Sequence, residues 1–237
     1  KINRLTDIAN EMEKIVKNEG RAESDRKSVE SRFIRNVERL ADGDLRSVLR
    51  DRTRAHAIDC VNWSEYPYAP KATFRVAHSD DALAVMFEVE ESHVRAVALD
   101  DNGPVWEDSC VEFFVAAPDG EGYFNFEVSC IATALAARRV SRAEADHFDA
   151  ERMARIRRFG SLPHAAVDSR GEGQRWWMVE VIPFALLGCD KAPERLRANF
   201  YKCGDKCDEP HFLSWSPIDL PAPNFHCPEF FGEVVLG

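Results

Sequence analysis

The chain has 237 residues, 45% of them hydrophobic, a composition typical of a folded globular protein and not of a disordered one. Its net charge is −10, and the acidic excess lies in residues 58–237, which hold 30 Asp and Glu against 17 Lys and Arg. Nucleic-acid binding needs a basic surface, so we expect no nucleic-acid partner. No apolar run approaches the roughly 20 residues of a membrane span, so we expect no membrane partner either.

The first 57 residues show helical periodicity in two apolar stripes. Leu5, Ile8, Met12, Ile15 and Val16 form the first stripe, and Val29, Phe33, Val37 and Leu40 form the second. This pattern predicts a helical N-terminal extension over residues 1–57, packed on the rest of the chain or used as a homo-oligomer contact.

Short segments with an apolar residue at every second position follow from residue 58 onward, separated by Pro, Gly and Asp. Such segments are typical of antiparallel strands, and many of them predict an all-β sandwich or barrel over residues 58–237. The expected strands include residues 73–77, 83–89, 176–182, 199–202 and 233–236. Residues 141–158 are polar, with Ser141 and Glu144 spaced as a capping box, and predict a helix or long loop at the rim.

Residues 105–129 predict a β-hairpin whose turn is the segment APDGEG, residues 117–122, because Pro and Asp-Gly favour tight turns. Folding the segment about this turn places six apolar residues on one face, as the pairs Val111 with Val128, Phe113 with Phe126, and Val115 with Phe124. The other face carries Cys110 opposite Ser129, Glu112 opposite Glu127, Phe114 opposite Asn125, and Ala116 opposite Tyr123. One face is therefore expected in the core and the other at a polar site.

The two glutamates of this hairpin need a physical reason, because directly opposed like charges destabilise an antiparallel pair. A basic side chain could relieve the repulsion, and Arg75, Arg138 and Lys202 are the candidates; a bound calcium ion would do the same. Alternatively, Glu112 and Glu127 could be the two carboxylates of a retaining glycosidase, which lie about 5–5.5 Å apart.

Aromatic residues gather near the predicted strand ends, where flat rings beside carboxylates suit the apolar faces and the hydroxyls of sugars. Trp106 and Trp215, both in loops bounded by Pro and Asp, are the two that we place at such a site, although a core position is as reasonable for any single Trp.

Cysteine and histidine residues in the C-terminal segment raise the question of a zinc site. Cys203, Cys207 and His211 are spaced four apart, and His226 and Cys227 follow, but no tight Cys-x2-Cys knuckle is present, which disfavours zinc. The seven cysteines are odd in number and irregularly spaced, whereas exported disulfide frameworks usually have even sets. Reduced thiols and a cytoplasmic location are expected, or a periplasmic or secreted location if a leader was removed.

Several motifs occur in order: WEDSCVEFF (106–114), YFNFE (123–127), IPF (182–184), RANFYKCGD (197–205), PHFLSWSPI (210–218) and NFHCPEFFGE (224–233). Together they resemble the family 9-like carbohydrate-binding modules of bacteria, over roughly residues 58–237. The resemblance implies a jelly-roll β-sandwich that binds a sugar between two tryptophans, with structural calcium common. It also implies that Trp106 is one stacking residue and Glu112 a hydroxyl-binding one, with Trp215 as the candidate for the second tryptophan.

The leading hypothesis is a non-catalytic module of carbohydrate catabolism that binds a mono- or oligosaccharide through Trp106, Glu112, Asn125, Glu127 and Trp215. The second is a glycoside hydrolase that uses Glu112 and Glu127. The third is an interaction protein assembled by its N-terminal helices.

Overall fold

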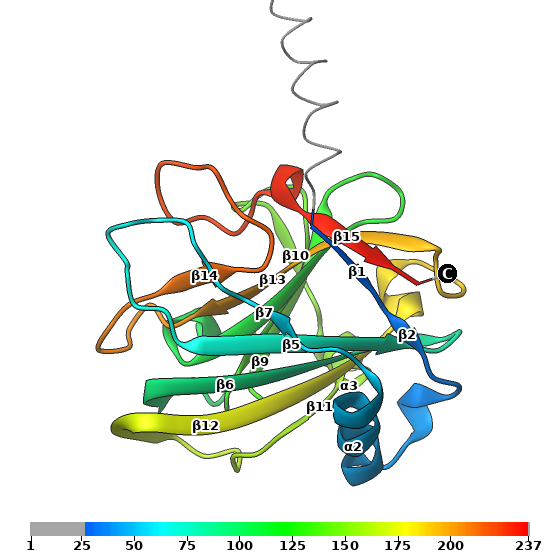
Figure 1. Cartoon of the computed structure of the whole chain (residues 1–237). Coiled ribbons are helices and arrows are strands. Elements are labelled where there is room, and N and C mark those ends of the chain that lie inside the picture. The colour runs from blue at the N-terminus through cyan, green and yellow to red at the C-terminus, as the bar shows by residue number, and fades with distance from the viewer. Residues whose placement is uncertain (1–26, 237) are drawn as a thin grey trace, which may run out of the picture.

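The computed structural model describes residues 27–236, and these residues form two packed β-sheets (Figure 1). Within this range the larger sheet has nine strands and the smaller has six, so the all-β sandwich expected from the sequence is confirmed. The larger sheet has the order β1-β15-β13-β7-β8-β9-β10, with β14 beside β13 and β4 beside β14. The smaller has the order β11-β12-β6-β5-β2, with β3 beside β5.

The strands of the larger sheet are β1 (Ser28–Glu30), β4 (Cys60–Val61), β7 (Cys110–Ala116), β8 (Tyr123–Ser129), β9 (Ala134–Arg139), β10 (Ala145–His147), β13 (Arg195–Cys203), β14 (Phe212–Ser214) and β15 (Gly232–Val235). Those of the smaller sheet are β2 (Arg32–Phe33), β3 (His56–Ala57), β5 (Lys71–His78), β6 (Ala82–Ala96), β11 (Arg157–Gly160) and β12 (Val167–Pro183).

Helices are few and short in the described part of the chain. They are α2 (Asp42–Arg52), α3 (Ala150–Ala154) and four 3-10 turns: η1 (Val37–Arg39), η2 (Val105–Glu107), η3 (Phe184–Leu187) and η4 (Pro228–Phe230). No helix among residues 27–236 is long and apolar enough to cross a membrane. Helix α2 packs Leu45 and Leu49 against the outer face of the smaller sheet (Figure 1).

The expected N-terminal helices need correction. The first stripe, Leu5 to Val16, lies outside the described residues, and the second is wrong: Val29 lies in β1, Phe33 in β2 and Val37 in η1. The cause is strand pairing with distant segments, since β1 pairs in parallel with β15, and β2 with β5. Residues 28–57 thus contribute strands to both sheets, and the helix in this region starts only at Asp42.

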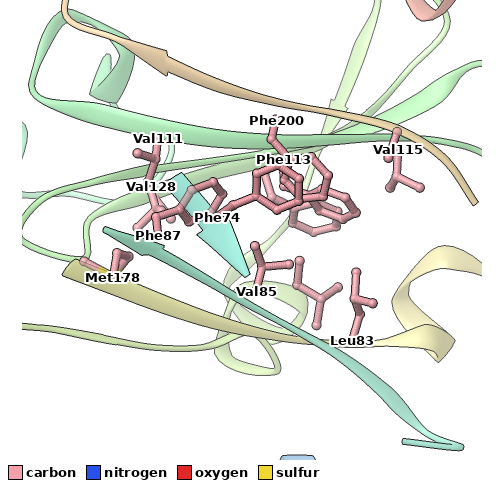
Figure 2. Packing of buried hydrophobic residues seen from close by; sticks show 14 of the residues in the cluster. Phe74, Leu83, Val85, Phe87, Val111, Phe113, Val115, Val128, Met178 and Phe200 are labelled. Atoms are coloured by element: carbon pink, nitrogen blue, oxygen red, sulfur yellow. The ribbon is translucent and has the colours of Figure 1, made fainter. Parts of the chain in front are cut away.

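The hairpin of β7 and β8 has the register expected from its turn, including the pair Glu112 and Glu127. Its apolar face lies in the core between the sheets, where Phe113 lies 5.1 Å, ring centre to ring centre, from Phe200 (Figure 2). Phe200 in turn stacks on Phe74 of the smaller sheet, with 3.6 Å between the ring centres. These rings join the two sheets and fix which face of the hairpin points outward.

The turn of this hairpin provides a test of its geometry. Gly120 and Gly122 both have φ near +80°, but a Cβ at Gly122 would lie 2.0 Å from the Arg139 carbonyl oxygen, whereas one at Gly120 would meet nothing within 4 Å. Gly120→Ala should therefore lower the free energy of unfolding by only about 1–2 kcal/mol, the penalty for a Cβ in the left-handed backbone conformation. Gly122→Ala should lower it by about 1–3 kcal/mol more, because the backbone of β9 at Arg139 must move away from the new methyl group.

Urea unfolding of the two variants and the parent measures the difference. Equal losses of stability in Gly120→Ala and Gly122→Ala would show that β9 does not approach the turn as described.

Candidate functional site

A cavity of about 480 Å³ opens on the outer face of the larger sheet, over the polar face of the hairpin. Strands β7, β8, β9 and β13 contribute its floor, and the loops that follow β4, precede β7 and surround β14 form its walls. Its lining residues are Tyr66, Trp106, Glu112, Glu127, Arg139, Arg142, Cys203, Asp205, Phe212, Pro223, Asn224, Phe225 and His226.

Glu112 and Glu127 form the floor and are 3% and 4% exposed. Asn125, two residues before Glu127 on β8, is fully buried, and its Nδ2 donates to Glu127 Oε1 at 2.8 Å. Arg139 Nε donates to Asn125 Oδ1 at 2.9 Å, so the amide links the guanidinium to the carboxylate. Glu127 Oε2 is buried and has no hydrogen-bond partner among the described residues. Asn125 therefore positions Glu127, and Glu127 keeps one oxygen for a ligand.

Arg139 and Arg142 are the arginines that line this site, and the three candidates from the sequence lie elsewhere. Arg75 pairs with Glu88 at 3.1 Å, Arg138 with Asp119 at 2.6 Å, and Lys202 with Glu91 at 2.9 Å. Arg138 and Arg139 are neighbours on β9, and successive side chains of a strand point to opposite faces. Only Arg139 shares the face of the glutamates.

Burial dominates the electrostatics of the floor. It raises the pKa of Glu127 to about 7, against the hydrogen bond from Asn125 and the charge of Arg139, which lower it. Burial, and then the charge of Glu127, raise the pKa of Glu112 well above its ordinary value. Burial and the nearby Glu107 raise the pKa of Asp205 to about 6. The repulsion expected between the opposed glutamates is thus relieved partly by retained protons.

Aromatic side chains form the walls. Trp106, on η2, is 38% exposed, and Tyr66, Phe212 and Phe225 also line the cavity. Trp106, a site residue expected from the sequence, therefore lies at the cavity, together with Phe212 and Phe225, which were not expected there. The alternation along β14 is the signal that could have found Phe212, because Leu213 of the same strand packs in the core.

Trp215 is not at this site, so its expected stacking role is wrong. It is 3% exposed and meets Phe74 and Phe200 edge-on in the core, with ring centres 5.6 and 5.7 Å apart. The cause is again alternation, since Leu213 and Trp215 point inward and Phe212 points to the cavity. Trp106 and Trp215 therefore lie on opposite sides of the larger sheet.

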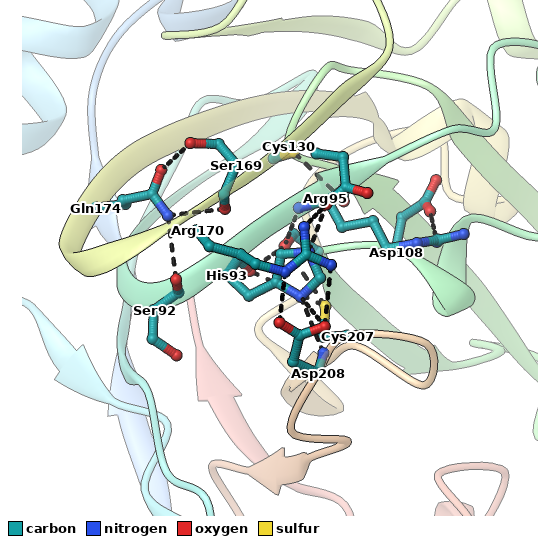
Figure 3. Close-up of polar contacts among 12 residues, drawn as sticks. Ser92, His93, Arg95, Asp108, Cys130, Ser169, Arg170, Gln174, Cys207 and Asp208 are labelled. Atoms are coloured by element: carbon teal, nitrogen blue, oxygen red, sulfur yellow. Dashed lines mark hydrogen bonds and ion pairs between the residues drawn. The ribbon is translucent and has the colours of Figure 1, made fainter.

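The loop that carries Trp106 is fixed by the buried carboxylate of Asp108 (Figure 3). Asp108 Oδ2 accepts the backbone N–H groups of Val97 and Ala98, both at 2.9 Å, and Oδ1 pairs with Arg95. Arg95 also donates to the carbonyl of Glu107 at 3.2 Å. The indole is therefore presented by a rigid turn.

The loop of residues 204–211, which carries Asp205, is tied to β6 and β12 (Figure 3). The backbone N–H of Asp208 donates to His93 Nδ1 at 2.9 Å, so His93 must donate through Nε2, which lies 2.8 Å from Asp168. Arg170 binds the Asp208 carboxylate at 2.6 and 3.0 Å. Asp205 also donates its N–H to the Trp106 carbonyl at 3.2 Å, so the two site loops hold each other.

The structure does not gather the Cys and His residues weighed for zinc. Cys207 Sγ lies 4.0 Å from the His93 carbonyl, His211 Nε2 lies 2.8 Å from Lys202 Nζ, and His226 Nδ1 lies 2.8 Å from the Tyr123 hydroxyl. The only group of three close metal-ligand side chains in residues 27–236 is Cys110, Glu112 and Cys203. Calcium takes oxygen ligands, so a group with two thiols does not fit it.

The raised pKa of Glu127 predicts a pH dependence of stability. Its carboxyl binds a proton more tightly in the folded state, with a pKa of about 7, than at its ordinary value of 4.5. The stability from this proton is fully present below about pH 4.5 and is lost as the pH rises to about 7. Glu127→Gln should therefore lose less stability than the parent between about pH 5 and about pH 8.

Urea unfolding at both pH values measures this effect. Glu151→Gln, at an exposed position of α3, is the control and should follow the parent. If Glu127→Gln and the parent lose equal stability over this range, the Glu127 carboxyl does not hold its proton as described.

A known protein family and several solved structures are similar to this chain. The family model for carbohydrate-binding family 9 matches residues 44–236. A crystal structure of a protein from Bacteroides uniformis, described as carbohydrate-binding, is 36% identical, with a TM-score of 0.85 over 90% of this chain and 100% of that one. No curated protein gives a match.

Two structures of a family 9 carbohydrate-binding module from Caldicellulosiruptor kristjanssonii share the fold at lower identity. The glucose complex is 15% identical, with a TM-score of 0.59 over 89% of this chain and 96% of that one. The cellotriose complex is 14% identical, with a TM-score of 0.57 over 89% and 93%. The family match, which spans most of the chain, together with the 36% identity to the Bacteroides protein, shows that this chain belongs to carbohydrate-binding family 9.

Proposed function

We propose that the cavity above Glu112 and Glu127 binds a mono- or oligosaccharide and that the protein is a non-catalytic carbohydrate-binding module. The observation that carries this proposal is the half-exposed indole of Trp106 beside two buried carboxyl groups, one of which keeps an unpartnered oxygen. A sugar ring offers an apolar face to an aromatic ring and hydroxyls to fixed acceptors, so it matches both features.

The roles of the lining residues follow from their positions. Trp106 provides the stacking surface, while Glu112 and Glu127 bind hydroxyl groups and Asn125 keeps Glu127 in place. The second aromatic surface is assigned to Phe212, Phe225 and Tyr66, which line the cavity where Trp215 does not.

The relatives support the choice of ligand for a test. The Caldicellulosiruptor module was crystallised with glucose and with cellotriose, so these two sugars are the first probes for this chain. A cavity of about 480 Å³ is within the ordinary range of small-ligand sites and accommodates a small sugar.

The electrostatics favour binding over hydrolysis. A retaining glycosidase needs one ionised carboxylate as the nucleophile beside one protonated acid. Here burial raises the pKa of Glu112 well above its ordinary value and that of Glu127 to about 7, so neither carboxyl has the low pKa expected of a permanently ionised nucleophile. The pair suits hydrogen bonding to hydroxyls better than it suits nucleophilic attack.

We also propose, as the sequence led us to expect, further features of this protein. These are a jelly-roll connection of the strands, a role in bacterial carbohydrate catabolism, and a location in the cytoplasm, with the periplasm or the exterior as the alternative. A homo-oligomer contact through the N-terminal extension of residues 1–57 also belongs here; residues 1–26 of this extension lie outside the described part of the chain.

Replacement of Trp106 tests the proposed function. Trp106→Ala should weaken the binding of cellotriose at least about tenfold, which corresponds to about 1.4 kcal/mol, because the stacking surface is lost. The matched control is Trp177→Ala, which removes a tryptophan from a groove on the smaller sheet and should leave the affinity unchanged.

Isothermal titration calorimetry measures the affinities, and circular dichroism checks that both variants fold. Equal affinity of the parent and Trp106→Ala, or loss of binding in Trp177→Ala alone, would contradict the assignment of the site.

A further inference from the structure

Two thiols and a carboxyl group meet at the base of the cavity. Cys110 on β7 pairs directly with Cys203 on β13, and Glu112 lies two residues along β7, on the same face. One ligand atom from each residue, Sγ, Sγ and a carboxylate oxygen, lies within 4.8 Å of the other two. Cys203 Sγ lies 3.0 Å from Glu112 Oε1, and all three residues are buried.

We propose that Cys110, Glu112 and Cys203 bind a thiophilic divalent cation of the zinc class, with a fourth coordination position open to the cavity. Tetrahedral zinc has Zn–S distances of about 2.3 Å and Zn–O distances of about 2.0–2.2 Å, which place neighbouring ligand atoms roughly 3.5 Å apart. Cys203 Sγ and Glu112 Oε1 are 3.0 Å apart, close to that value, and all three ligand atoms lie within 4.8 Å of one another, so the group is near the spacing that a tetrahedral ion needs.

The cavity gives a zinc-class cation a path to the three side chains, and the ligand types favour this cation over calcium and magnesium. Glu112 and Cys203 line the cavity, which provides the ion with a path from solvent. The two sulfur ligands favour zinc over calcium or magnesium, which prefer oxygen. Three protein ligands with the fourth position left to water or substrate are a known zinc arrangement, and two of the three ligands proposed here line the cavity.

The positively charged side chains near these three residues are bound to other partners. Lys202, adjacent to Cys203, is the nearest ammonium along the chain, but its Nζ is held by Glu91 at 2.9 Å, the Cys203 carbonyl at 2.8 Å and His211 at 2.8 Å. Arg139 is held by Asn125 and by the Arg142 carbonyl. Among the described residues, no hydrogen bond or ion pair joins either cation to the Cys110, Glu112 or Cys203 side chain. The unpartnered Glu127 Oε2 lies on the same floor.

Occupancy by a cation would also bear on the sugar site. Metal binding takes a Glu112 oxygen and releases the thiol protons, and the open position can accept a sugar hydroxyl. The cation site itself rests on the three side chains alone and does not depend on sugar binding.

Cadmium titration of the full-length, reduced, metal-free protein tests the proposal, because thiolate–cadmium bonds give a charge-transfer absorption in the ultraviolet. We expect one equivalent of Cd²⁺ to produce this absorption and zinc to displace it. Cys110→Ala, Cys203→Ala and Glu112→Gln should each weaken binding at least about tenfold, since even residues that only support ligands contribute 10- to 100-fold. Cys189→Ala, at a partly exposed thiol, is the control and should bind as the parent does.

Glu112→Gln keeps both thiols, so it still tests the site if a cysteine variant fails to fold. The proposal is overturned if the parent gives no thiolate–cadmium absorption, if Cys189→Ala alone removes it, or if Glu112→Gln and either folded cysteine variant bind cadmium as the parent does. Calorimetry with cellotriose on the metal-free parent is run in parallel, so failure of the cation site and failure of sugar binding are recorded separately.

Discussion

The direct opposition of Glu112 and Glu127 across β7 and β8 is the constraint on which the site depends. Two like charges in this position would destabilise the hairpin if both were ionised and unpaired. Burial raises the pKa of both glutamates, so retained protons reduce the repulsion. Hydrogen bonds also link Glu127 through Asn125 to Arg139. An apolar pair buried at these positions would cost less free energy of folding, so we infer that the carboxyl groups serve to bind a ligand and not to stabilise the fold.

The remainder of the sandwich supplies rigidity to this pair. The phenyl rings of Phe74, Phe113 and Phe200 join the two sheets behind the hairpin, so its polar face cannot turn inward. In front of it, Asp108 anchors the turn that carries Trp106, and Arg170 anchors the loop that carries Asp205. A pre-organised cavity loses little conformational entropy on binding, which favours recognition of a small polar ligand that offers few contacts.

Much of the site was readable from the sequence because the β-hairpin is local. A tight turn and a period of two fix the register of β7 and β8, and hence the faces of Glu112, Asn125 and Glu127. The errors come from longer-range packing: the parallel pairing of β1 with β15 overrides a helical period at Val29. The inward orientation of Trp215 depends on the register of β14, a three-residue strand that was not among those predicted from the sequence.

An NMR titration of the indole N–H signals with cellotriose is the most direct test of whether a sugar binds beside Trp106. The chain has five tryptophans, and each gives a separate probe. Trp63, Trp176 and Trp215 are buried, and Trp177 lies at the groove of the smaller sheet. Sugar binding beside Trp106 predicts that the Trp106 signal shifts most and that the Trp177 signal does not shift. A dominant shift at Trp177, with Trp106 unchanged, would contradict it.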